Sequence, residues 1–362
     1  MLIIRDMNTL FNEITPVELG FYMPAEWHKQ EAIWLSWPHN EETWPGIFDR
    51  IPSVFAEMVY HISQNQFVKI NVKDIEHETL VRKILAESKA NLSAVKFYHI
   101  PTNDAWCRDH GPTFLVKDSN GSKEKAIVNW QFNSWGGKYP FDLDNGVPDS
   151  ILKYENFRSF DPGIVMEGGS IEVNGKGTVL TTKACLLNDN RNSHLVQHQV
   201  EDYLRAYLGV KQVLWLEDGI LGDDTNGHID DLSRFVNQNT IVTIVEEDES
   251  DENYKILDEN FHLLKSMKDL DGKPFNIVKL PMPSPVIVEG ERLPASYANF
   301  LIANNIVLMP VFQDKNDKVA RDILQGYFPD RKVVGINCRD LVLGLGTLHC
   351  VSQQEPWTGI DY

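Results

Sequence analysis

Four short motifs in the 362-residue chain carry side chains that could take part in covalent chemistry. Together they supply a thiol, an imidazole and three carboxylates, a combination typical of a Cys-His nucleophilic site with surplus negative charge. The motifs are Trp106-Cys107-Arg108-Asp109, Glu167-Gly168-Gly169, Asn226-Gly227-His228-Ile229-Asp230 and Gly346-Thr347-Leu348-His349-Cys350. A fifth motif, Ala295-Ser296-Tyr297-Ala298-Asn299, occupies the corresponding place in a further repeat of the chain.

The surplus of carboxylates indicates the kind of substrate. A cysteine protease has little use for three of them, because an acyl oxyanion needs hydrogen-bond donors instead. Carboxylates suit a substrate that carries its positive charge in a planar fork, namely a guanidinium. A metal site is the rival use of histidine and carboxylates, but the chain has no H-E-x-x-H motif. We therefore expect a small cationic guanidine substrate and no metal.

Each residue also has an ordinary structural interpretation. Asp109 could form a common ion pair, Glu167 could belong to a turn, and His228 could pair with Asp230 on one face of a strand. A lone cysteine such as Cys350 is usually a small buried hydrophobe. The combination of all five favours chemistry over any of these alternatives.

Two other groups lie outside this set. Strand alternation would put Cys107 on the same face as Asp109, but a free cysteine is seldom reactive, so we expect Cys107 to be structural. His194 and His198 have helical i, i+4 spacing and lie away from the carboxylate motifs. We expect both to be surface residues.

The composition excludes several classes of protein. The chain has 34 Lys and Arg against 52 Asp and Glu, a formal net charge of −18, whereas nucleic-acid binding needs clustered positive charge. No apolar run approaches the roughly 20 residues that span a bilayer, and Met1–Asn12 lacks the features of a signal peptide. The four cysteines form no C-x-x-C pair. We expect a cytoplasmic protein with no nucleic-acid or membrane partner.

The elements that must position the motifs recur along the chain. Four pairs of β-prone segments, joined by Asn- or Gly-containing turns, predict hairpins. The pairs are 113–116 with 126–132 across Asp118-Ser119-Asn120-Gly121, 170–173 with 178–182, 232–236 with 240–245, and 300–303 with 306–311. Amphipathic helices are predicted at 48–62, 194–208, 254–267 and 317–328, each followed by a strand, at 68–72, 213–216, 276–280 and 333–336 respectively.

This recurrence predicts a repeat architecture in one closed domain. The chemical motifs precede the first hairpin strand of their repeats, so a closed ring would bring them together at one axis. The segment 344–352 is expected to form one more strand, to pair with 32–36 and to deliver Cys350 to that axis. The acidic run 246–252 is expected to be a solvated loop.

Five ordered motifs extend these segments. They are Trp106-x-Arg108-Asp109-x-Gly111-Pro112, Phe132-Asn133-x-Trp135-Gly136-Gly137-Lys138-Tyr139, Glu167-Gly168-Gly169, Gly227-His228-Ile229-Asp230 and His349-Cys350-x-x-Gln353-Gln354-x-Pro356. They resemble the motifs of agmatine deiminases, members of the guanidine-modifying (pentein) superfamily, which includes arginine deiminases and bacterial peptidyl-arginine deiminases. The resemblance implies an α/β fold, a five-bladed pentein propeller of ββαβ repeats with pseudo-fivefold symmetry. It also implies one catalytic domain over residues 1–362, with its core at about 20–357.

The same resemblance implies a reaction and roles. The reaction is hydrolysis of agmatine to N-carbamoylputrescine and ammonia through a covalent thiouronium intermediate, with no metal or organic cofactor. Cys350 would be the nucleophile, and His228 would protonate the departing ammonia and then activate water. Asp109 and Asp230 would grip the guanidinium. Glu167 would hold the imidazole in position.

Trp106, Trp135 and Gly346 complete the expected substrate-binding set. The two indoles could pack on the guanidinium or on the substrate methylenes, although a core role remains an alternative for both. The glycine allows close backbone approach to a ligand. The chain departs from the family at Leu345 and Thr347, where a glycine and an asparagine are usual, and at Asn226, where an aspartate is usual.

Two alternative functions stay open. A deiminase of free or peptide-borne arginine would need an extra donor near the pocket mouth, for which Arg108, Arg191 or Lys138 could serve. A catalytically silent guanidine- or polyamine-binding protein has no use for a nucleophile, so the complete set argues against it. Homo-oligomers are common among such enzymes, which leaves a second copy of the chain as a further partner. Polyamine synthesis and agmatine catabolism are both compatible with the reaction.

Overall fold

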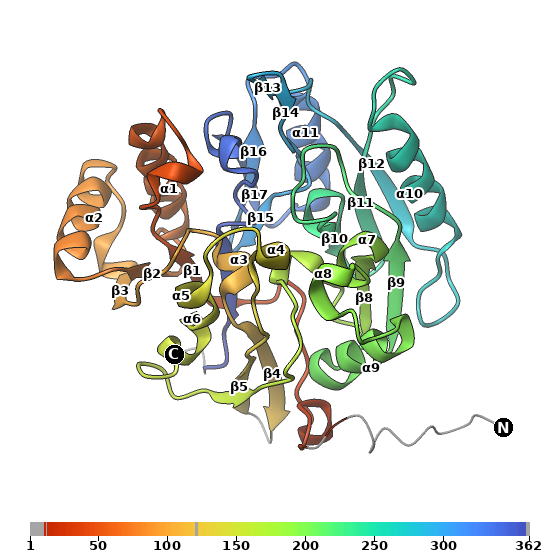
Figure 1. Cartoon of the computed structure of the whole chain (residues 1–362), viewed down its shortest axis with the longest axis horizontal. Coiled ribbons are helices and arrows are strands. Elements are labelled where there is room, and N and C mark those ends of the chain that lie inside the picture. The colour runs from red at the N-terminus through yellow and green to blue at the C-terminus, as the bar shows by residue number, and fades with distance from the viewer. Residues whose placement is uncertain (1–10, 12, 120–121, 360–362) are drawn as a thin grey trace.

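Short strands and helices alternate along the whole described chain. The computed structural model describes residues 11, 13–119 and 122–359, so the turn predicted at Asn120-Gly121 and nearly all of Met1–Asn12 lie outside the described residues. The predicted α/β fold is confirmed, and the longer helices lie at the periphery in the view of Figure 1.

Five sheets share one arrangement, in which the first and second strands pair antiparallel and the second and third pair in parallel. In four of them the antiparallel pair is a hairpin, and in the fifth it joins segments from opposite ends of the described chain. The sheets are β4 (Thr113–Ser119), β5 (Ser122–Val128) and β6 (Arg158–Phe160); β7 (Glu172–Val173), β8 (Thr178–Thr182) and β9 (Gln212–Leu216); β10 (Ser233–Asn237), β11 (Thr240–Val245) and β12 (Asn276–Pro281); β15 (Leu301–Ala303), β16 (Ile306–Val311) and β17 (Lys332–Asn337); and β18 (Ser352–Pro356), β1 (Gln30–Ser36) and β2 (Phe67–Val72), which β3 (Val95–His99) extends. A separate two-stranded sheet pairs β13 (Ile287–Val288) with β14 (Glu291–Arg292).

Helices occupy the connection from the second to the third strand in each of these five sheets. They are α1 (Ile51–Ile62) after β1; α4 (Ser134–Gly137), α5 (Asp142–Asn145) and α6 (Val147–Ile151) after β5; α7 (Lys183–Leu186), α8 (Asp189–Asn192) and α9 (Gln197–Leu208) after β8; α10 (Tyr254–Ser266) after β11; and α11 (Asp317–Tyr327) after β16. Two others, α2 (Ile75–Glu87) and α3 (Cys107–His110), follow β2 and β3.

The predicted helices at 48–62 and 194–208 begin later than expected. Residues Phe48–Arg50 form a 3-10 turn, and α1 starts at Ile51 because Pro52, which has no free N–H, fits only in the first helical turn. Helix α9 starts at Gln197, so His194 lies ahead of the helix and does not share a face of it with His198. Both histidines are exposed, as predicted.

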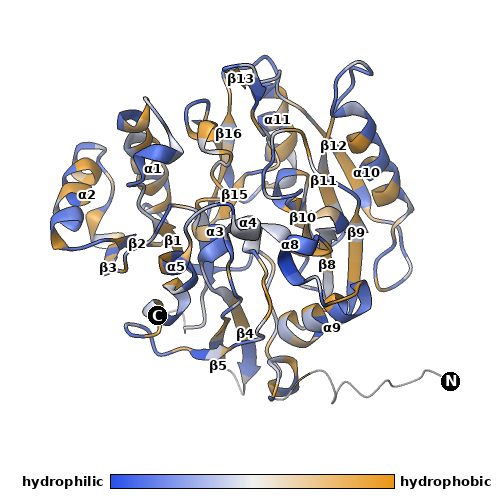
Figure 2. Ribbon diagram, in the orientation of Figure 1, coloured by the Kyte–Doolittle hydropathy of each residue, from blue (hydrophilic) through white to orange (hydrophobic). Residues whose placement is uncertain are grey.

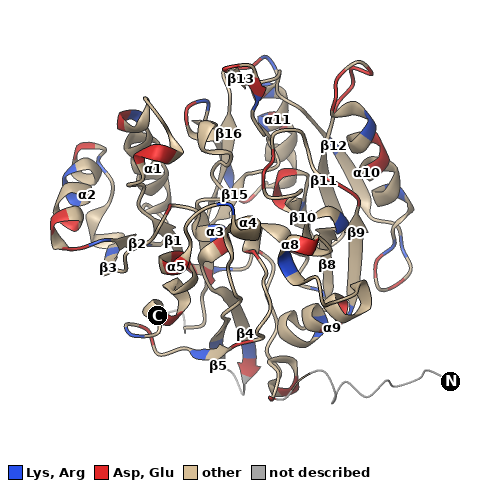
Figure 3. Ribbon diagram, viewed as in Figure 1, with Lys and Arg blue, Asp and Glu red and all other residues tan. Residues whose placement is uncertain are grey.

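Burial explains why these segments form strands and amphipathic helices. Every residue of β8 and β11 is buried, which matches their continuous β-branched and apolar sequences. Helix α11 buries Ala320 and Leu324, four residues apart, while Val319 is exposed. Figures 2 and 3 show the mixed apolar and charged residues of the outer helices. No described helix is long and apolar enough to cross a membrane. The acidic run 246–252 is a loop, as predicted.

The C-terminal strand pairs with the N-terminal strand through residues 32–35, as predicted, but the paired C-terminal residues lie further along the chain than expected. Strand β18 starts at Ser352, and its antiparallel register puts Ser352 opposite Leu35 and Gln353 opposite Trp34. The predicted strand at 344–352 is therefore wrong. Leu345 has a left-handed φ of 70°, and Asn299 accepts hydrogen bonds from the backbone of His349, so this stretch cannot join a ladder.

A buried ion-pair network holds β18 against β1 and β2. Glu355 Oε2 accepts hydrogen bonds from Trp34 Nε1 at 2.7 Å and from Lys69 Nζ at 2.8 Å. The other oxygen of Glu355 contacts Lys125 Nζ at 2.5 Å. Lys69 and Glu355 are both almost completely buried. Lys69 Nζ also pairs with Glu155 Oε1 at 2.6 Å, but Glu155 is partly exposed, so removing Glu355 takes away the one fully buried carboxylate that Lys69 contacts.

We expect Glu355→Ala to lower the free energy of unfolding by about 3–5 kcal/mol, because Lys69 would keep a buried charge and Trp34 would lose its acceptor. Urea denaturation at pH 7 measures this change. Glu31→Ala is the matched control, since Glu31 also pairs with Lys125 but is partly exposed, and it should cost less than about 1 kcal/mol. Equal losses for the two variants would contradict this interpretation.

Candidate active site

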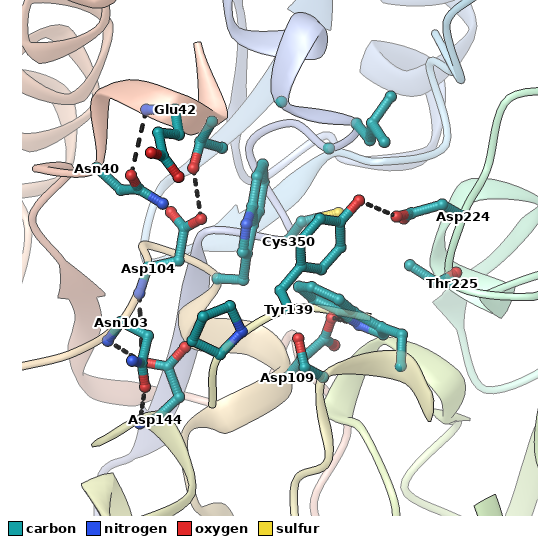
Figure 4. Close-up of a pocket in the computed structure, with 18 of the residues that line it drawn as sticks. Asn40, Glu42, Asn103, Asp104, Asp109, Tyr139, Asp144, Asp224, Thr225 and Cys350 are labelled. Atoms are coloured by element: carbon teal, nitrogen blue, oxygen red, sulfur yellow. Dashed lines mark hydrogen bonds between the residues drawn. The ribbon is translucent and has the colours of Figure 1, made fainter. Parts of the chain in front are cut away.

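The chemical motifs converge on one cavity of about 720 Å³ (Figure 4). The predicted site residues that line it are Trp106, Asp109, Trp135, Gly346 and Cys350. The three others, Glu167, His228 and Asp230, are buried behind this wall. The predicted convergence is therefore confirmed. Five of the residues line the cavity, and the other three are buried beside them, as with His228 next to Asp109 and Asp230 next to Cys350.

Cys350 presents its thiol to carboxylates. Its Sγ lies 4.0 Å from Asp230 Oδ2 and 3.0 Å from Asn299 Nδ2. Burial, together with the negative charges of Asp230, Asp231 and Asp109, raises the pKa of this thiol well above its ordinary value. A cation bound between the sulfur and these carboxylates would reverse the electrostatic part of that effect.

Asp109 is held in the cavity wall by two donors. It lies in α3, and its carboxylate accepts hydrogen bonds from Trp135 Nε1 at 2.9 Å and from the backbone N–H of Gly169 at 2.9 Å. Burial raises the pKa of Asp109 to about 6, and the nearby Asp230 and Glu167 add to the effect while His228 opposes it. A cation bound beside Asp109 would favour its ionised form and lower this pKa.

His228 lies between two carboxylates. Its Nδ1 is 3.8 Å from Asp109 Oδ2, and its Nε2 is 4.0 Å from Glu167 Oε2. Burial disfavours the imidazolium, but Asp109 and the Cys185 side chain outweigh this effect and hold the pKa of His228 well above its ordinary value. Glu167 is fixed in turn by Arg191, whose Nε donates to Glu167 Oε1 at 2.6 Å.

Asp230 is tied to the residue that precedes the thiol. The ring nitrogens of His349 lie 2.6 Å from Asp230 Oδ2 and 3.0 Å from Glu26 Oε2. Burial opposes ionisation of Asp230, but the hydrogen bond and charge of His349 lower its pKa. Glu26 also pairs with the buried guanidinium of Arg234.

Gly346 is required by close packing beside the nucleophile. A Cβ at this position would lie 2.6 Å from the indole of Trp106 and 3.2 Å from Cys350 Sγ. The neighbouring Leu345 lines the cavity with a left-handed φ of 70°, a conformation that suits the glycine usual in the family. Thr347, the second departure, donates from Oγ1 to Asn299 Oδ1 at 2.7 Å.

The third departure, Asn226, contacts Arg191, the residue that holds Glu167. Its Oδ1 accepts hydrogen bonds from Arg191 Nη1 at 2.8 Å and from Asn190 Nδ2 at 3.1 Å. Its φ is 69°, which an asparagine tolerates better than most residues. Asn226 therefore helps to hold the arginine that positions Glu167.

The mouth of the cavity is acidic. Glu42, Asp104, Asp144 and Asp224 line the cavity, and Lys73 is the one lysine or arginine among the described lining residues. Burial raises the pKa of Asp144 to about 8 and also raises that of Asp104, so Glu42 and Asp224 carry most of the negative charge at neutral pH. Tyr139 donates from its hydroxyl to Asp224 Oδ2 at 2.8 Å across the opening, as Figure 4 shows. The cavity as a whole therefore favours cationic ligands.

Two sets of side chains have donor atoms within 4.8 Å of one another and could hold a metal ion. One set is Glu167, Cys185 and His228, and the other is Asp230, Asp231 and Cys350. Each contains residues that the guanidine chemistry would use, so an ion in either set would compete with that chemistry.

The local structure of the motifs differs from the predicted strands. Asp109 and Cys107 lie in the short helix α3, so the predicted strand alternation between them is wrong, and Cys107 does not line the cavity. His228 precedes a 3-10 turn, Ile229–Asp231, rather than sharing a strand face with Asp230. Hydrogen bonds that close these turns stop the segments from joining a ladder.

Sequence reasoning missed several supporting residues. Asn299, His349, Cys185 and Glu26 all contact a predicted site residue or its direct support. Asn299 and His349 belong to motifs that the sequence singled out, so their types and positions were available as a signal. Glu26 lies in Pro24-Ala25-Glu26-Trp27, where the family resemblance begins, whereas Cys185 had no signal beyond its residue type.

Comparisons with known proteins agree with this geometry. The family model described as Porphyromonas-type peptidyl-arginine deiminase matches residues 22–356. A Legionella pneumophila subsp. pneumophila protein named "Putative agmatine deiminase" is 38% identical over 354 residues, 97% of this chain and 98% of that protein. The chain therefore belongs to the Porphyromonas-type peptidyl-arginine deiminase family, and its predicted resemblance to agmatine deiminases is confirmed.

Solved structures share the fold. The agmatine deiminase of Enterococcus faecalis superposes with a TM-score of 0.88 at 35% identity, covering 96% of this chain and 98% of that one. A structure from Porphyromonas gingivalis titled "Putative Arginine Deiminase" superposes with a TM-score of 0.85 at 38% identity, covering 93% and 98%. The names of these relatives divide between two guanidine substrates.

We expect Gly169→Ala to destabilise the site, because its Cβ would lie 2.5 Å from His228 Nδ1 and 2.9 Å from Asp109 Oδ1. Overpacking of this kind costs about 1–3 kcal/mol of unfolding free energy, which urea denaturation measures. Gly326→Ala in α11 is the control, since no heavy atom lies within 4 Å of its Cβ, and it should be neutral or slightly stabilising. A Gly169→Ala protein as stable as the control would show that the site tolerates the methyl group.

Proposed function

We propose that this protein hydrolyses agmatine to N-carbamoylputrescine and ammonia through a covalent intermediate on Cys350. The observation that carries the proposal is the thiol of Cys350 facing the same cavity as the Asp109 carboxylate, with Asp230 Oδ2 4.0 Å from the sulfur. A planar guanidinium between the two aspartates would place its carbon beside the thiol. The proposal includes the arrangement of these five sheets as blades of a five-bladed propeller, and a cytoplasmic location.

Binding of the substrate guanidinium would favour ionisation of the Cys350 thiol. In the absence of substrate, burial and three carboxylates favour the neutral thiol. A guanidinium that pairs with Asp109 and Asp230 would neutralise part of that negative charge and favour the thiolate. Trp106 and Trp135, which line the cavity, would cover the substrate and exclude water from it.

Two half-reactions follow. The thiolate attacks the guanidinium carbon, the bond from that carbon to one terminal nitrogen breaks, and His228 gives a proton to the departing ammonia. His228 then takes one proton from water, and the water oxygen attacks the same carbon. The carbon–sulfur bond breaks and the thiolate leaves, while the second proton of that water passes to solvent as the neutral ureido product forms. The raised pKa of His228 supports its start as an imidazolium, and Glu167 would hold the ring in position.

The charge of the cavity favours agmatine over arginine. Agmatine is cationic at both ends and would meet the carboxylates of the mouth with its amine. Arginine would bring its own carboxylate to the same place. Of the donors considered for it, Arg108 and Arg191 are buried in hydrogen bonds to Gln353 and Glu167, and Lys138 contacts the backbone oxygen of Asp224.

We expect kcat/KM for agmatine to exceed that for free arginine and for a blocked arginine peptide by at least about 100-fold, because a misplaced charge at the mouth costs several kcal/mol. Ammonia and ureido product are the readouts.

Cys350→Ser should abolish turnover of all substrates without changing the unfolding free energy by more than about 1 kcal/mol, since the side chains have similar volume. Preferred turnover of arginine or peptide would keep the nucleophile and overturn the substrate. Tight binding of agmatine without ammonia release would favour a binding protein.

We expect an acidic limb near pH 6 in the pH profile of kcat/KM for agmatine. Asp109 must be ionised to grip the guanidinium, and its pKa in the free protein is raised to about 6, so kcat/KM should fall up to tenfold per unit below that pH. A bound guanidinium favours the carboxylate, so the limb should move to lower pH in the profile of kcat. Agmatine keeps both charges over this range, so an unchanged kcat/KM down to pH 4.5 would contradict the assignment of Asp109.

A further inference from the structure

Two buried atoms behind the cavity wall face each other without a hydrogen bond. Glu167 Oε2 and His228 Nε2 lie 4.0 Å apart, which is too long for a hydrogen bond, and neither atom has another hydrogen-bond partner among the described residues. Both side chains are almost completely buried. A buried polar atom without a partner is costly, so a group bound between these two atoms would be stabilising.

The thiol of Cys185 completes a cluster with these two side chains. Its sulfur, a carboxylate oxygen of Glu167 and a ring nitrogen of His228 all lie within 4.8 Å of one another, and Cys185 is completely buried. Thiolate, imidazole and carboxylate are the ligands that Zn²⁺ prefers. Ligands at about 2.0–2.3 Å from a tetrahedral ion stand roughly 3.3–3.8 Å apart, so each donor would have to move by less than about 1 Å.

The surrounding hydrogen bonds hold the three donors in place. Thr182, the N-cap residue of α7, donates from Oγ1 to the backbone oxygen of Gly227 at 2.6 Å, which joins the segment of Cys185 to that of His228. Arg191 binds Oε1 of Glu167, so that Oε2 remains for another partner. The cluster is therefore preorganised by groups that are not themselves ligands.

The other set of possible metal ligands has a weaker case. Asp230, Asp231 and Cys350 include no imidazole, and Asp230 Oδ2, which lies 4.0 Å from the Cys350 sulfur, is held by His349 at 2.6 Å. An ion there would have to compete with that contact. The oxygen and nitrogen that face each other in the first set have no such partner among the described residues.

We propose that Cys185, His228 and Glu167 form an inhibitory binding site for Zn²⁺, separate from the nucleophile. Metal ligands must be deprotonated, so the ion would displace the proton of the Cys185 thiol and that of the His228 imidazolium. Two protons would leave as a divalent ion enters, and the net charge of the buried cluster would stay the same. A His228 bound to the ion is no longer an imidazolium and cannot give a proton to the departing ammonia. The inhibition rests on the proposed function, whereas the binding of the ion does not.

Co²⁺ is the probe for the site, because a thiolate bound to Co²⁺ gives a charge-transfer band in the near ultraviolet. In Cys350→Ala protein, which lacks the thiol of the nucleophile, we expect this band to saturate at about one Co²⁺ per chain and to vanish when Zn²⁺, the tighter-binding ion, displaces it. In the same background, Cys185→Ser should remove the band. Cys338→Ser is the control, since Cys338 is also completely buried but lies outside the cluster, and it should keep the band.

Two results would overturn the proposal. One is the absence of the band in Cys350→Ala protein, which is also expected if only a water molecule fills the gap. The other is an unchanged band after Cys185→Ser. If the serine variant fails to fold, Cys185→Ala takes the same test. X-ray absorption of the Zn²⁺-loaded Cys350→Ala protein needs no further variant, and it should show a single sulfur at about 2.3 Å with nitrogen or oxygen ligands at about 2.0–2.2 Å. A zinc shell without sulfur would contradict the site.

Turnover of agmatine tests the inhibition. After incubation with Zn²⁺, each protein is compared with its own rate without metal, and EDTA should restore the parent rate. We expect the Zn²⁺ concentration for half-inhibition to be at least about tenfold higher in Cys185→Ser than in the parent protein, since even the loss of a group that supports a ligand costs about 10- to 100-fold in metal affinity. Equal concentrations would place the inhibitory ion elsewhere and overturn the inhibitory role. If the parent protein does not turn agmatine over, the proposed function fails, and the Co²⁺ spectra still decide whether the site exists.

Discussion

The guanidinium of Arg234 is the interaction on which the site depends. It donates to Glu172 and Glu26 and to the backbone oxygens of Ala298 and Phe300, and the ring of Phe300 packs on it at 4.7 Å. Four segments far apart in the sequence therefore meet at one side chain. A completely buried cation must be paired on all sides to be tolerated. Glu26 contacts His349, and His349 contacts Asp230. The pairing of Arg234 with Glu26 therefore helps to position the Asp230 carboxylate, which lies 4.0 Å from Cys350 Sγ.

The sequence predicted those secondary-structure elements and candidate site residues that depend on residue types and spacing within a short stretch of chain. Hairpins, helices and their order could be predicted because each depends on turn residues and apolar spacing within a few dozen residues. The convergence of Asp109, Glu167, His228 and Asp230 could be predicted because reactive residue types stood at equivalent points of successive repeats. Cys350 could be added because pairing of the C-terminal segment with the N-terminal one brings it to the same place. The five motifs then identified a family, which the comparisons confirm.

What could not be predicted depends on side-chain contacts between distant segments. Asn299 is distinguished by the three groups that its oxygen accepts from, all of them some 50 residues away along the chain. Similarly, the short helix α3 and the turn at Ile229–Asp231 replace predicted strands because local hydrogen bonds close them. Asp is depleted in strands, and these local hydrogen bonds favour turns over a ladder.

The pairing of β18 with β1 has a consequence for biosynthesis. Glu355 of β18 accepts a hydrogen bond from Trp34 of β1 and follows it by 321 residues, so a ribosome needs about 15–65 s to travel between them. During that time β1 can pair with β2, while the edge that β18 later covers stays open. This edge carries the buried residues Ile33 and Leu35, and an open apolar edge invites pairing with other chains. A nascent chain is therefore most exposed to aggregation just before the nucleophile arrives.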